Sequence, residues 1–320
     1  MNNRILQHYR FGKIFAWINR HLRSRRKAID KIRALYQKFG LVSDGCSLCE
    51  SDDFSLISEG DRYGFDLKKQ LCNQCGLVQT YPALPTKFHQ EFYSHHYRPL
   101  YLKSREVNYS SVIKEQTDKG TKYLNYFREN GLTNEILNKT SIIEIGCSSG
   151  GTLNVLKPFV KSVQGCDLDV KAIEFANNNF DIDVEVSMYP TEIPKGNKLF
   201  VMSHVLEHVE NPLKTLKQLR ALMEEGDYLF IAVPGLNMVA KGDYKNDLRR
   251  YFHIAHVTDF TGTTLTNVAH YAGFQTLSID EEINGLFVAD KATHWVKSES
   301  DSVENIQYIE TTYRGLPPHL

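Results

Sequence analysis

The stretch from Ser141 to Gly151 reads SIIEIGCSSGG and decides the fold class of this 320-residue chain. Its first half is a short apolar run, which predicts a buried strand, and its second half is a turn of glycines and serines. Glycine lets the backbone approach a ligand closely, and a helix that follows such a turn offers free N–H groups. We therefore expect a ligand to lie where this strand ends, and a ligand-free glycine turn is the alternative.

Four more short apolar runs follow, and helical segments separate them. They cover residues 163–166, 184–186, 199–202 and 228–233. Strands that alternate with helices predict a parallel sheet with right-handed crossovers. Two further candidates, Phe274 to Asp280 and Leu286 to Ala289, would close the sheet with an antiparallel edge. The predicted fold class is therefore α/β, with a doubly wound, Rossmann-like sheet of seven strands.

The second predicted strand ends at Asp167, about twenty residues after the glycine turn, where a carboxylate can accept hydrogen bonds from both hydroxyls of a ribose. A dinucleotide is disfavoured, because its pyrophosphate requires glycine where this chain has Ser148. An acid at the end of the first strand, Glu144, adds nothing for a pyrophosphate. It favours a cationic ligand, because its carboxylate can help to hold an ammonium group.

At these residues the chain resembles the class I methyltransferases, which use S-adenosyl-L-methionine. Their first motif is an acid-x-Gly-x-Gly-x-Gly run in which the middle glycine is often replaced, and Ile143 to Gly150 matches it with that replacement. The second match is more specific. Residues 204–212 read HVLEHVENP, which looks like the Leu-Glu-His-x-x-x-Pro signature after the fourth strand of many small-molecule and sugar methyltransferases.

The resemblance implies S-adenosyl-L-methionine as the cofactor and assigns roles to individual residues. Asp167 would bind the ribose, and Ser187 and Met188 would flank the adenine, although Ser187 stands where the family often has an acid. Glu207 and His208 would lie beside the transferred methyl group. The residues expected to bind the cofactor are Glu144, Gly146, Cys147, Gly150, Asp167, Leu168, Ser187, Met188 and Ser203.

Four histidines follow the fourth and fifth predicted strands, at the carboxyl edge where open α/β sheets bind ligands. An acceptor must lose a proton as it attacks the methyl group, and an imidazole with a pKa near 6.5 can take it at neutral pH. His208 is the first candidate for this base, and Glu207 would orient it or bind substrate. His253 and His256 are secondary candidates, and His204 is expected to contact the substrate. A structural hydrogen bond is the alternative for each histidine.

Arg249 and Arg250 precede a helix that Thr258 or Asp259 could cap, so we expect this pair in a loop over the substrate pocket. Two arginines suit a phosphate or a carboxylate of the acceptor. A nucleotide-sugar, lipid-linked or phosphorylated acceptor would supply such a group. A solvated, salt-bridging pair is the alternative.

Four of the six cysteines form two Cys-x-x-Cys pairs, Cys46 with Cys49 and Cys72 with Cys75. In a reducing compartment this spacing indicates metal before disulfide, and two such knuckles supply the four tetrahedral ligands of zinc. Four sulfur ligands leave no open coordination position, so the Zn²⁺ is expected to be structural. The residues between the pairs allow a β-hairpin arm. A metal-free or redox role is the alternative.

Residues 72–78 and 92–97 resemble the zinc-binding leader of sugar and glycan methyltransferases, in which Cys-x-x-Cys-Gly-Leu-Val precedes a Phe-Tyr-x-x-x-Tyr motif. This resemblance implies a sugar or glycan acceptor in a polysaccharide or nucleotide-sugar pathway. A nucleic-acid substrate is disfavoured, because Ser203 and His204 stand where an Asn/Asp-Pro-Pro-Tyr type of motif would. The alternative function is a catalytically inactive methyltransferase-fold scaffold that contacts membrane or nucleic acid.

Charge is unevenly distributed, because residues 1–40 carry 11 Lys and Arg but a single acid. Apolar residues recur there at helical spacing, over 11–22 and 29–39, so we expect two basic amphipathic helices. They suit an anionic membrane surface, and packing on the catalytic domain or on a second subunit is the alternative. No stretch reaches the roughly 18–20 apolar residues of a membrane span, and no secretory signal is present. A cytoplasmic location, peripheral at the membrane if the helices bind it, is expected.

The predicted organisation has five parts. Basic helices cover 1–40, the zinc ribbon 41–85, a helical connector 86–135, the S-adenosylmethionine-binding domain 136–290 and a tail 291–320. The patterns indicate neither the oligomeric state nor whether oxygen, nitrogen or carbon accepts the methyl group.

Overall fold

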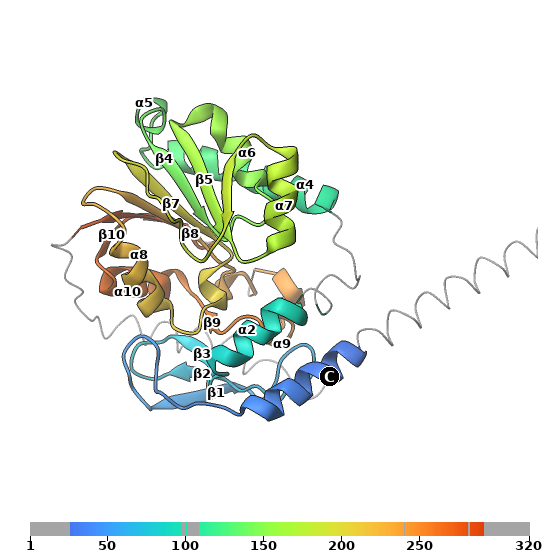
Figure 1. Ribbon diagram of the computed structural model, residues 1–320. Coiled ribbons are helices and arrows are strands. Elements are labelled where there is room, and N and C mark those ends of the chain that lie inside the picture. The colour runs from blue at the N-terminus through green and yellow to red at the C-terminus, as the bar shows by residue number, and fades with distance from the viewer. Residues whose placement is uncertain (1–25, 98–99, 101–108, 240, 281, 291–320) are drawn as a thin grey trace, which may run out of the picture. The chain divides into compact units, whose positions relative to one another are not determined.

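The computed structural model describes residues 26–97, 100, 109–239, 241–280 and 282–290 (Figure 1). They belong to two compact units. The first unit comprises the described parts of Met1–Val42 and Leu84–Asn108, and the second those of Ser43–Ala83 and Tyr109–Leu320. The first basic amphipathic helix, expected over 11–22, and the tail 291–320 lie outside the described residues.

The first unit contains a helix over 26–39 and α2 (Thr86–His95). In the helix over 26–39, Ala28, Ile32 and Leu35 are buried, while most of the charged residues between them are exposed. This one-sided burial confirms the second amphipathic helix. Within the described part of the chain, no helix is both long and apolar enough to span a membrane.

The second unit is built on a seven-stranded sheet, as predicted. Its strands in spatial order are β10 (Phe274–Ile279), β11 (Asn284–Ala289), β8 (Tyr228–Ala232), β7 (Lys198–Ser203), β4 (Ser141–Ile145), β5 (Ser162–Asp167) and β6 (Asp183–Val186). Neighbouring strands from β8 to β6 are parallel, whereas β11 runs antiparallel to both β8 and β10. The strand order reverses around β4, so the loops after β4 and β7 diverge there and leave room for a ligand.

Helices cover both faces of this sheet. Successive side chains of a strand point to opposite faces, so Ile142 packs in one core and Ile143 in the other. The first core includes side chains of α4 (Tyr109–Glu129), α6 (Gly151–Leu156) and α7 (Val170–Asn179). The second includes side chains of α8 (Pro212–Arg220) and α10 (Gly262–Tyr271). The shorter elements are α5 (Asn134–Leu137), η1 (Lys157–Phe159), η2 (Leu206–His208), η3 (Leu236–Val239), η4 (Asp243–Asn246), α9 (Leu248–Tyr251) and β9 (Thr258–Asp259).

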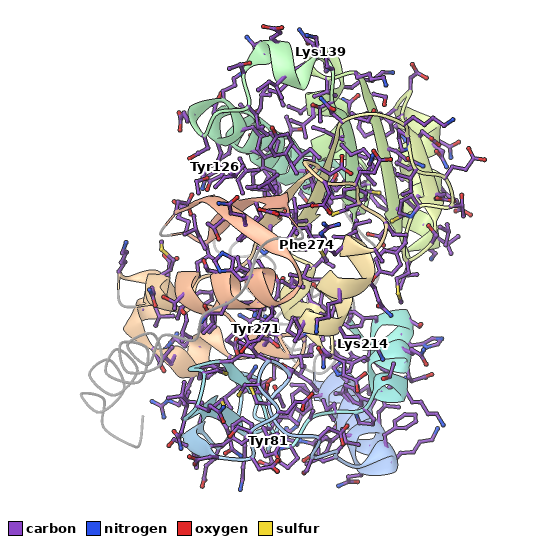
Figure 2. All side chains as sticks on the ribbon, turned by 90° about the vertical axis from the view of Figure 1, so that its left-hand side faces the viewer. Tyr81, Tyr126, Lys139, Lys214, Tyr271 and Phe274 are labelled. Carbon is purple, nitrogen blue, oxygen red and sulfur yellow. The ribbon has the colours of Figure 1, made fainter. Side chains whose placement is uncertain are left out.

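The cysteine-rich segment folds as a small antiparallel sheet of β1 (Phe54–Ser58), β2 (Lys69–Cys72) and β3 (Val78–Thr80). The hairpin expected between the cysteine pairs is thus confirmed. Its fourth strand is β9, far along the chain, which pairs with β3. The buried cysteines of this ribbon belong to the same core as α8 and α10, and Tyr271 at the end of α10 packs against that core (Figure 2). The ribbon therefore shares a core with the larger sheet.

The start of α10 differs from the prediction. Thr258 and Asp259 do not cap a helix, because they pair with β3 as the strand β9. The cap is Thr261, whose Oγ1 accepts from the backbone N–H of Thr264 at 3.2 Å, while Thr264 Oγ1 accepts from Thr261 N–H at 2.9 Å. Such a reciprocal box satisfies two backbone donors that the helix itself leaves unpaired. Pairing with the distant strand β3 thus placed Thr258 and Asp259 in a strand, although local capping rules favoured them as helix caps.

Candidate active site

The loop after β4 is bent sharply by residues with positive φ, namely Gly146 (+75°), Ser148 (+47°) and Gly150 (+74°). A Cβ on Gly146 would lie 2.5 Å from Val205 Cγ2, and one on Gly150 would lie 2.4 Å from Ile182 Cδ1. Both positions therefore require glycine. Ser148 adopts a conformation that is uncommon for a residue with a side chain, and such backbone strain is frequent at ligand sites.

Asp167 ends β5 beside this loop, and backbone amides fix its carboxylate. Its Oδ2 accepts from Ser148 N–H at 2.8 Å, and its Oδ1 accepts from Asp169 N–H at 2.8 Å. An ionised carboxylate has about four acceptor positions on its two oxygens. This geometry can accept two adjacent hydroxyl groups.

Glu144 lies one residue before the end of β4 and is 2% exposed. Its Oε2 makes no hydrogen bond with any of the described residues. Burial, followed by the nearby charge of Asp167, raises the pKa of Glu144 to about 8. A cation beside this carboxyl would lower the pKa and give the buried oxygen a partner. The chemistry of the site therefore fits an ammonium group.

Large apolar side chains are exposed beside Asp167. Leu168 is 65% and Met188 is 60% exposed, and Ser187, which precedes Met188, is half-buried. Such side chains offer an apolar surface to a flat ring. Cys147, in contrast, is fully buried, so only its backbone can reach a ligand.

The helix α4 contributes two site residues, Gln116 and Tyr123, that were not predicted. Gln116 Nε2 donates to Cys147 O at 3.1 Å, and Gln116 Oε1 accepts from Ser149 Oγ and from Gly151 N–H at 3.0 and 3.1 Å. Tyr123, which is also buried, places its hydroxyl 2.7 Å from Ser203 Oγ at the end of β7. Gln116 and Tyr123 are seven residues apart and therefore lie on one helix face. That spacing was visible in the segment predicted only as a connector.

The turn η2 after β7 holds a buried carboxylate among imidazoles. Glu207 is 1% exposed, and its Oε1 lies 3.3 Å from His204 Nδ1 and 3.7 Å from His208 Nε2. Burial alone would raise the pKa of Glu207, but the imidazoles of His208 and His204 lower it overall. The backbone of His204 has a positive φ of 55°. The turn is thus a strained, charged feature at the carboxyl edge of the sheet.

His208 is oriented by a backbone carbonyl, because its Nδ1 lies 2.8 Å from Ala255 O. A carbonyl can only accept, so Nδ1 carries the proton and Nε2 of the neutral ring keeps a lone pair. This Nε2 is the atom on the side of Glu207. A proton taken up there would be stabilised by the carboxylate, as a general base requires.

His253 and His256 are buried behind His208. Their ring centroids are 3.6 Å apart, and that of His256 is 5.0 Å from that of His208. Burial, more than the nearby Arg62, lowers the pKa of His253, and burial also lowers the pKa of His256. Ligand-type atoms of Glu207, His208 and His256 all lie within 4.8 Å of one another. The structure therefore places His204, His208 and His256 close to the Glu207 carboxylate, and His253 packs against His256.

The arginine pair was predicted to lie in a loop. It lies instead on the short helix α9. Leu248 and Tyr251 are buried and anchor this turn, which leaves Arg249 half-buried and Arg250 exposed. Arg249 Nε lies 3.4 Å from Asp247 Oδ1, and Arg250 Nε lies 3.5 Å from Asp247 Oδ2. One carboxylate thus partly neutralises both guanidinium groups.

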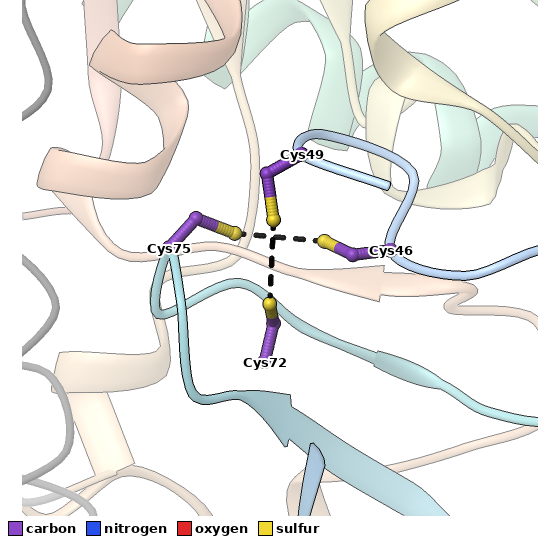
Figure 3. Close-up of side chains that lie close together, drawn as sticks. All are labelled: Cys46, Cys49, Cys72 and Cys75. Atoms are coloured by element: carbon purple, nitrogen blue, oxygen red, sulfur yellow. Dashed lines mark hydrogen bonds between the residues drawn. The ribbon is translucent and has the colours of Figure 1, made fainter. Parts of the chain in front are cut away.

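The four paired cysteines converge from the two knuckles of the ribbon (Figure 3). Cys46 Sγ lies 3.5 Å from Cys75 Sγ, and Cys49 Sγ lies 3.5 Å from Cys72 Sγ. Zn–S bonds of about 2.3 Å in a tetrahedron place the sulfurs about 3.8 Å apart, close to these distances. None of the cysteines forms a disulfide. The donor set therefore fits a structural zinc ion.

Comparison with known proteins places residues 97–279 in a family model described as a methyltransferase domain. No curated protein is significantly similar in sequence. Solved structures with a similar fold include the plantazolicin methyltransferase BpumL with a desmethyl analogue and SAH (15% identity, 72% of this chain and 89% of that chain, TM-score 0.41). Others are the SAM-bound amino pentose methyltransferase CalS10 from Micromonospora echinaspora (8%, 58% and 98%, 0.44) and an S-adenosylmethionine-dependent methyltransferase from Clostridium acetobutylicum (12%, 63% and 99%, 0.41).

Proposed function

Because this chain belongs to the methyltransferase domain family and is an S-adenosylmethionine-dependent methyltransferase, we propose that it methylates a sugar, glycan or other small-molecule acceptor at the turn of Glu207 and His208. The observation that carries this proposal is the pair itself. A buried carboxylate lies beside an imidazole whose tautomer leaves Nε2 able to accept a proton. That arrangement is suited to deprotonating a nucleophile.

In this proposal the cofactor lies along the carboxyl ends of β4, β5 and β6. Asp167 accepts hydrogen bonds from the ribose hydroxyls, and Glu144 holds the methionine ammonium directly or through water. Leu168 and Met188 cover the adenine, and the backbone of the glycine loop receives the carboxylate end. The fixed Asp167 carboxylate, the unsatisfied Glu144 oxygen and the exposed apolar pair support these roles.

When bound, S-adenosylmethionine would supply the methyl group by in-line displacement: the acceptor atom would bond to the methyl carbon as the sulfur–carbon bond breaks, with S-adenosylhomocysteine as the leaving group. The acceptor proton passes to His208 Nε2, and Glu207 stabilises the imidazolium. Alignment of donor and acceptor can lower such a barrier by about 7–11 kcal/mol. His253 and His256 are less suited to be the base, because burial lowers both pKa values.

A sugar or glycan is the favoured acceptor because the zinc-binding leader resembles that of sugar and glycan methyltransferases. Arg249 and Arg250 add a site for a phosphate or carboxylate, weakened by Asp247. A nucleotide-sugar or lipid-linked sugar would present such a group. In this proposal the four cysteines hold one structural zinc ion.

We also propose that the enzyme works in the cytoplasm, with its basic residues 1–40 on an anionic membrane surface. Each Lys or Arg near such a surface contributes about 1 kcal/mol. The test is co-sedimentation of full-length protein, and of protein that starts at Leu41, with anionic and neutral liposomes. Only the full-length protein should pellet, and only with anionic liposomes. If both forms stay in the supernatant at low salt, the membrane proposal for residues 1–40 fails.

The acceptor can be identified by mass spectrometry of cell extracts. Extracts treated with wild-type enzyme and labelled S-adenosylmethionine should contain a metabolite or glycan that gains one methyl group. His208→Ala should leave that compound unlabelled while still binding the cofactor. Labelling confined to protein or nucleic acid would refute the proposed acceptor class.

A further inference from the structure

Backbone hydrogen bonds join the zinc ribbon to the segment 252–259. A further backbone hydrogen bond joins that segment to the turn of Glu207 and His208. On the ribbon side, Arg62 N–H donates to Phe252 O at 3.0 Å and Thr80 N–H donates to Val257 O at 2.8 Å. On the other side, Val257 N–H donates to Glu207 O at 2.8 Å. The segment 252–259 therefore bridges the ribbon and the turn 206–208, which are far apart in the chain.

Asp61 is the first ribbon side chain that holds this bridge. Its Oδ1 accepts from the backbone N–H groups of Tyr63 and Phe65 at 2.8 and 3.0 Å, which shapes the ribbon's own loop. Its Oδ2 accepts from Ile254 N–H at 2.8 Å. Ile254 immediately precedes Ala255, whose carbonyl orients His208. One buried carboxylate thus connects the ribbon to the residue beside that carbonyl.

Lys69 is the second ribbon side chain that holds this bridge. Its Nζ donates to His256 O and to Asp259 Oδ2, both at 2.6 Å. Lys69 and Asp259 are each 1% exposed. A buried ion pair of this kind requires close geometry, because either charge alone would be costly in the interior. The pair therefore fixes the far side of Ala255, as Asp61 fixes its near side.

We propose that the ribbon is a positioning element for the methyl-transfer base. Asp61 and Lys69 hold the segment 252–259 so that the carbonyl of Ala255 keeps His208 in the tautomer with the proton on Nδ1 and none on Nε2. The inference rests on the proposed role of His208 as the base. It gives the ribbon a function in the reaction beyond its own folding, and it makes Asp61 and Lys69 positioning residues that touch neither cofactor nor acceptor.

The direct test is the tautomer of His208, measured by ¹H–¹⁵N correlation spectra of the full-length, zinc-loaded protein with labelled histidine. His208→Gln identifies the signal among the twelve histidines. In the wild-type protein His208 should carry its proton on Nδ1. A wild-type signal for the Nε2–H tautomer would overturn the proposal without any further variant.

Asp61→Asn tests the bridge. An amide has one oxygen, which should stay with the two donors at Tyr63 and Phe65, so its NH₂ group would oppose Ile254 N–H. The His208 signal should then shift towards the other tautomer. Turnover should fall by about 10²-fold, as expected when a reacting group is misplaced, while the affinity for S-adenosylmethionine stays unchanged. Lys69→Met should do the same from the other side.

The matched control is Asp53→Asn, which alters a ribbon carboxylate that accepts from Asn73 Nδ2 and is not bonded to the segment 252–259. All three variants should keep one zinc per chain. If Asp61→Asn and Lys69→Met retain zinc, tautomer and turnover as the control does, the ribbon does not position the base. If the tautomer shifts but turnover does not change, positioning stands and the proposed role of His208 fails.

Discussion

The two halves of the site are held in different ways. The proposed cofactor edge comprises the loop 146–151, Asp167 and the segment 187–188, which lie in one continuous stretch of chain, and Gln116 of α4 also bonds the loop. Its carboxylate at Asp167 is fixed by amides close to it in sequence or one strand away. The acceptor edge comprises the turn 206–208 and the segment 252–259, and it is held by residues of the ribbon.

This difference indicates which half can vary independently. In the proposed function the cofactor edge binds the same ligand in every turnover, and it is held by backbone amides near Asp167 and by Gln116 of α4. The proposed acceptor edge is hydrogen-bonded to the ribbon, so we expect changes in the ribbon to alter turnover while cofactor affinity is retained. Each of the following experiments therefore measures cofactor affinity and turnover separately.

The largest effect is expected from His208→Ala. Turnover should fall by about 10²–10⁴-fold, because a general base is lost, while the affinity for S-adenosylmethionine stays unchanged. His270→Gln is the control, because His270 bonds Thr276 and lies outside both edges. Steady-state kinetics and isothermal titration give the two values. Near-normal turnover of His208→Ala would leave the acceptor edge without a base.

Cys46→Ser should remove the zinc ion and loosen the ribbon, so residues 43–83 should become sensitive to protease. Because the ribbon holds the segment 252–259, turnover should fall by about 10²-fold, with cofactor affinity retained. Metal analysis should find one zinc per chain in the wild-type protein and close to none in the variant. A value of two would indicate that Glu207, His208 and His256 also hold a metal, and a value of zero would refute the zinc site.

Asp167→Ala should lower cofactor affinity and largely retain turnover, the opposite of the effect expected for Cys46→Ser. It removes acceptors for two ribose hydroxyls, and a hydrogen bond to a charged group contributes about 1.5–3 kcal/mol, which corresponds to about 10- to 100-fold in cofactor affinity. Turnover at saturating cofactor should change much less. The measurement is isothermal titration, with Asp169→Asn as a control for the neighbouring helix cap. Equal affinity in wild type and Asp167→Ala would contradict the proposed ribose site.

The smallest effect is expected from Glu144→Gln, on the pH dependence of thermal stability. Its pKa is raised to about 8 in the folded protein, above its ordinary value of 4.5. The unfolded chain therefore loses this proton first, so Glu144 makes the cofactor-free protein progressively less stable from pH 4.5 to 8. Glu144→Gln should remove that dependence, and its melting temperature should exceed that of wild type by a few degrees at pH 8 but not at pH 4.5. Thermal unfolding at both pH values gives this difference, and equal differences would contradict the raised pKa.

The sequence predicted the strands of the proposed cofactor edge better than the contacts of the proposed acceptor edge. Short-range patterns were sufficient for the strands around Glu144 and Asp167, because each is a local apolar run with a turn at its end. They failed at Thr258 and Asp259, where pairing with β3 replaced a helix cap. The bond from Asp61 to Ile254 and the buried pair of Lys69 and Asp259 could not be predicted, because nothing local marks residues so far apart as neighbours.

The strand β9 also constrains how such enzymes can be recombined. It completes the sheet of the ribbon although Lys69 and Asp259, which hold it, are 190 residues apart in the chain. An exchange of residues 43–83 between two relatives would therefore combine three strands of one parent with the fourth strand of the other. Only a transplant that also carries 252–259 would keep the donor's interface complete. The ribbon is thus encoded by two separated segments of the chain. A chimera that exchanges only the first segment would separate β9 from the other three strands.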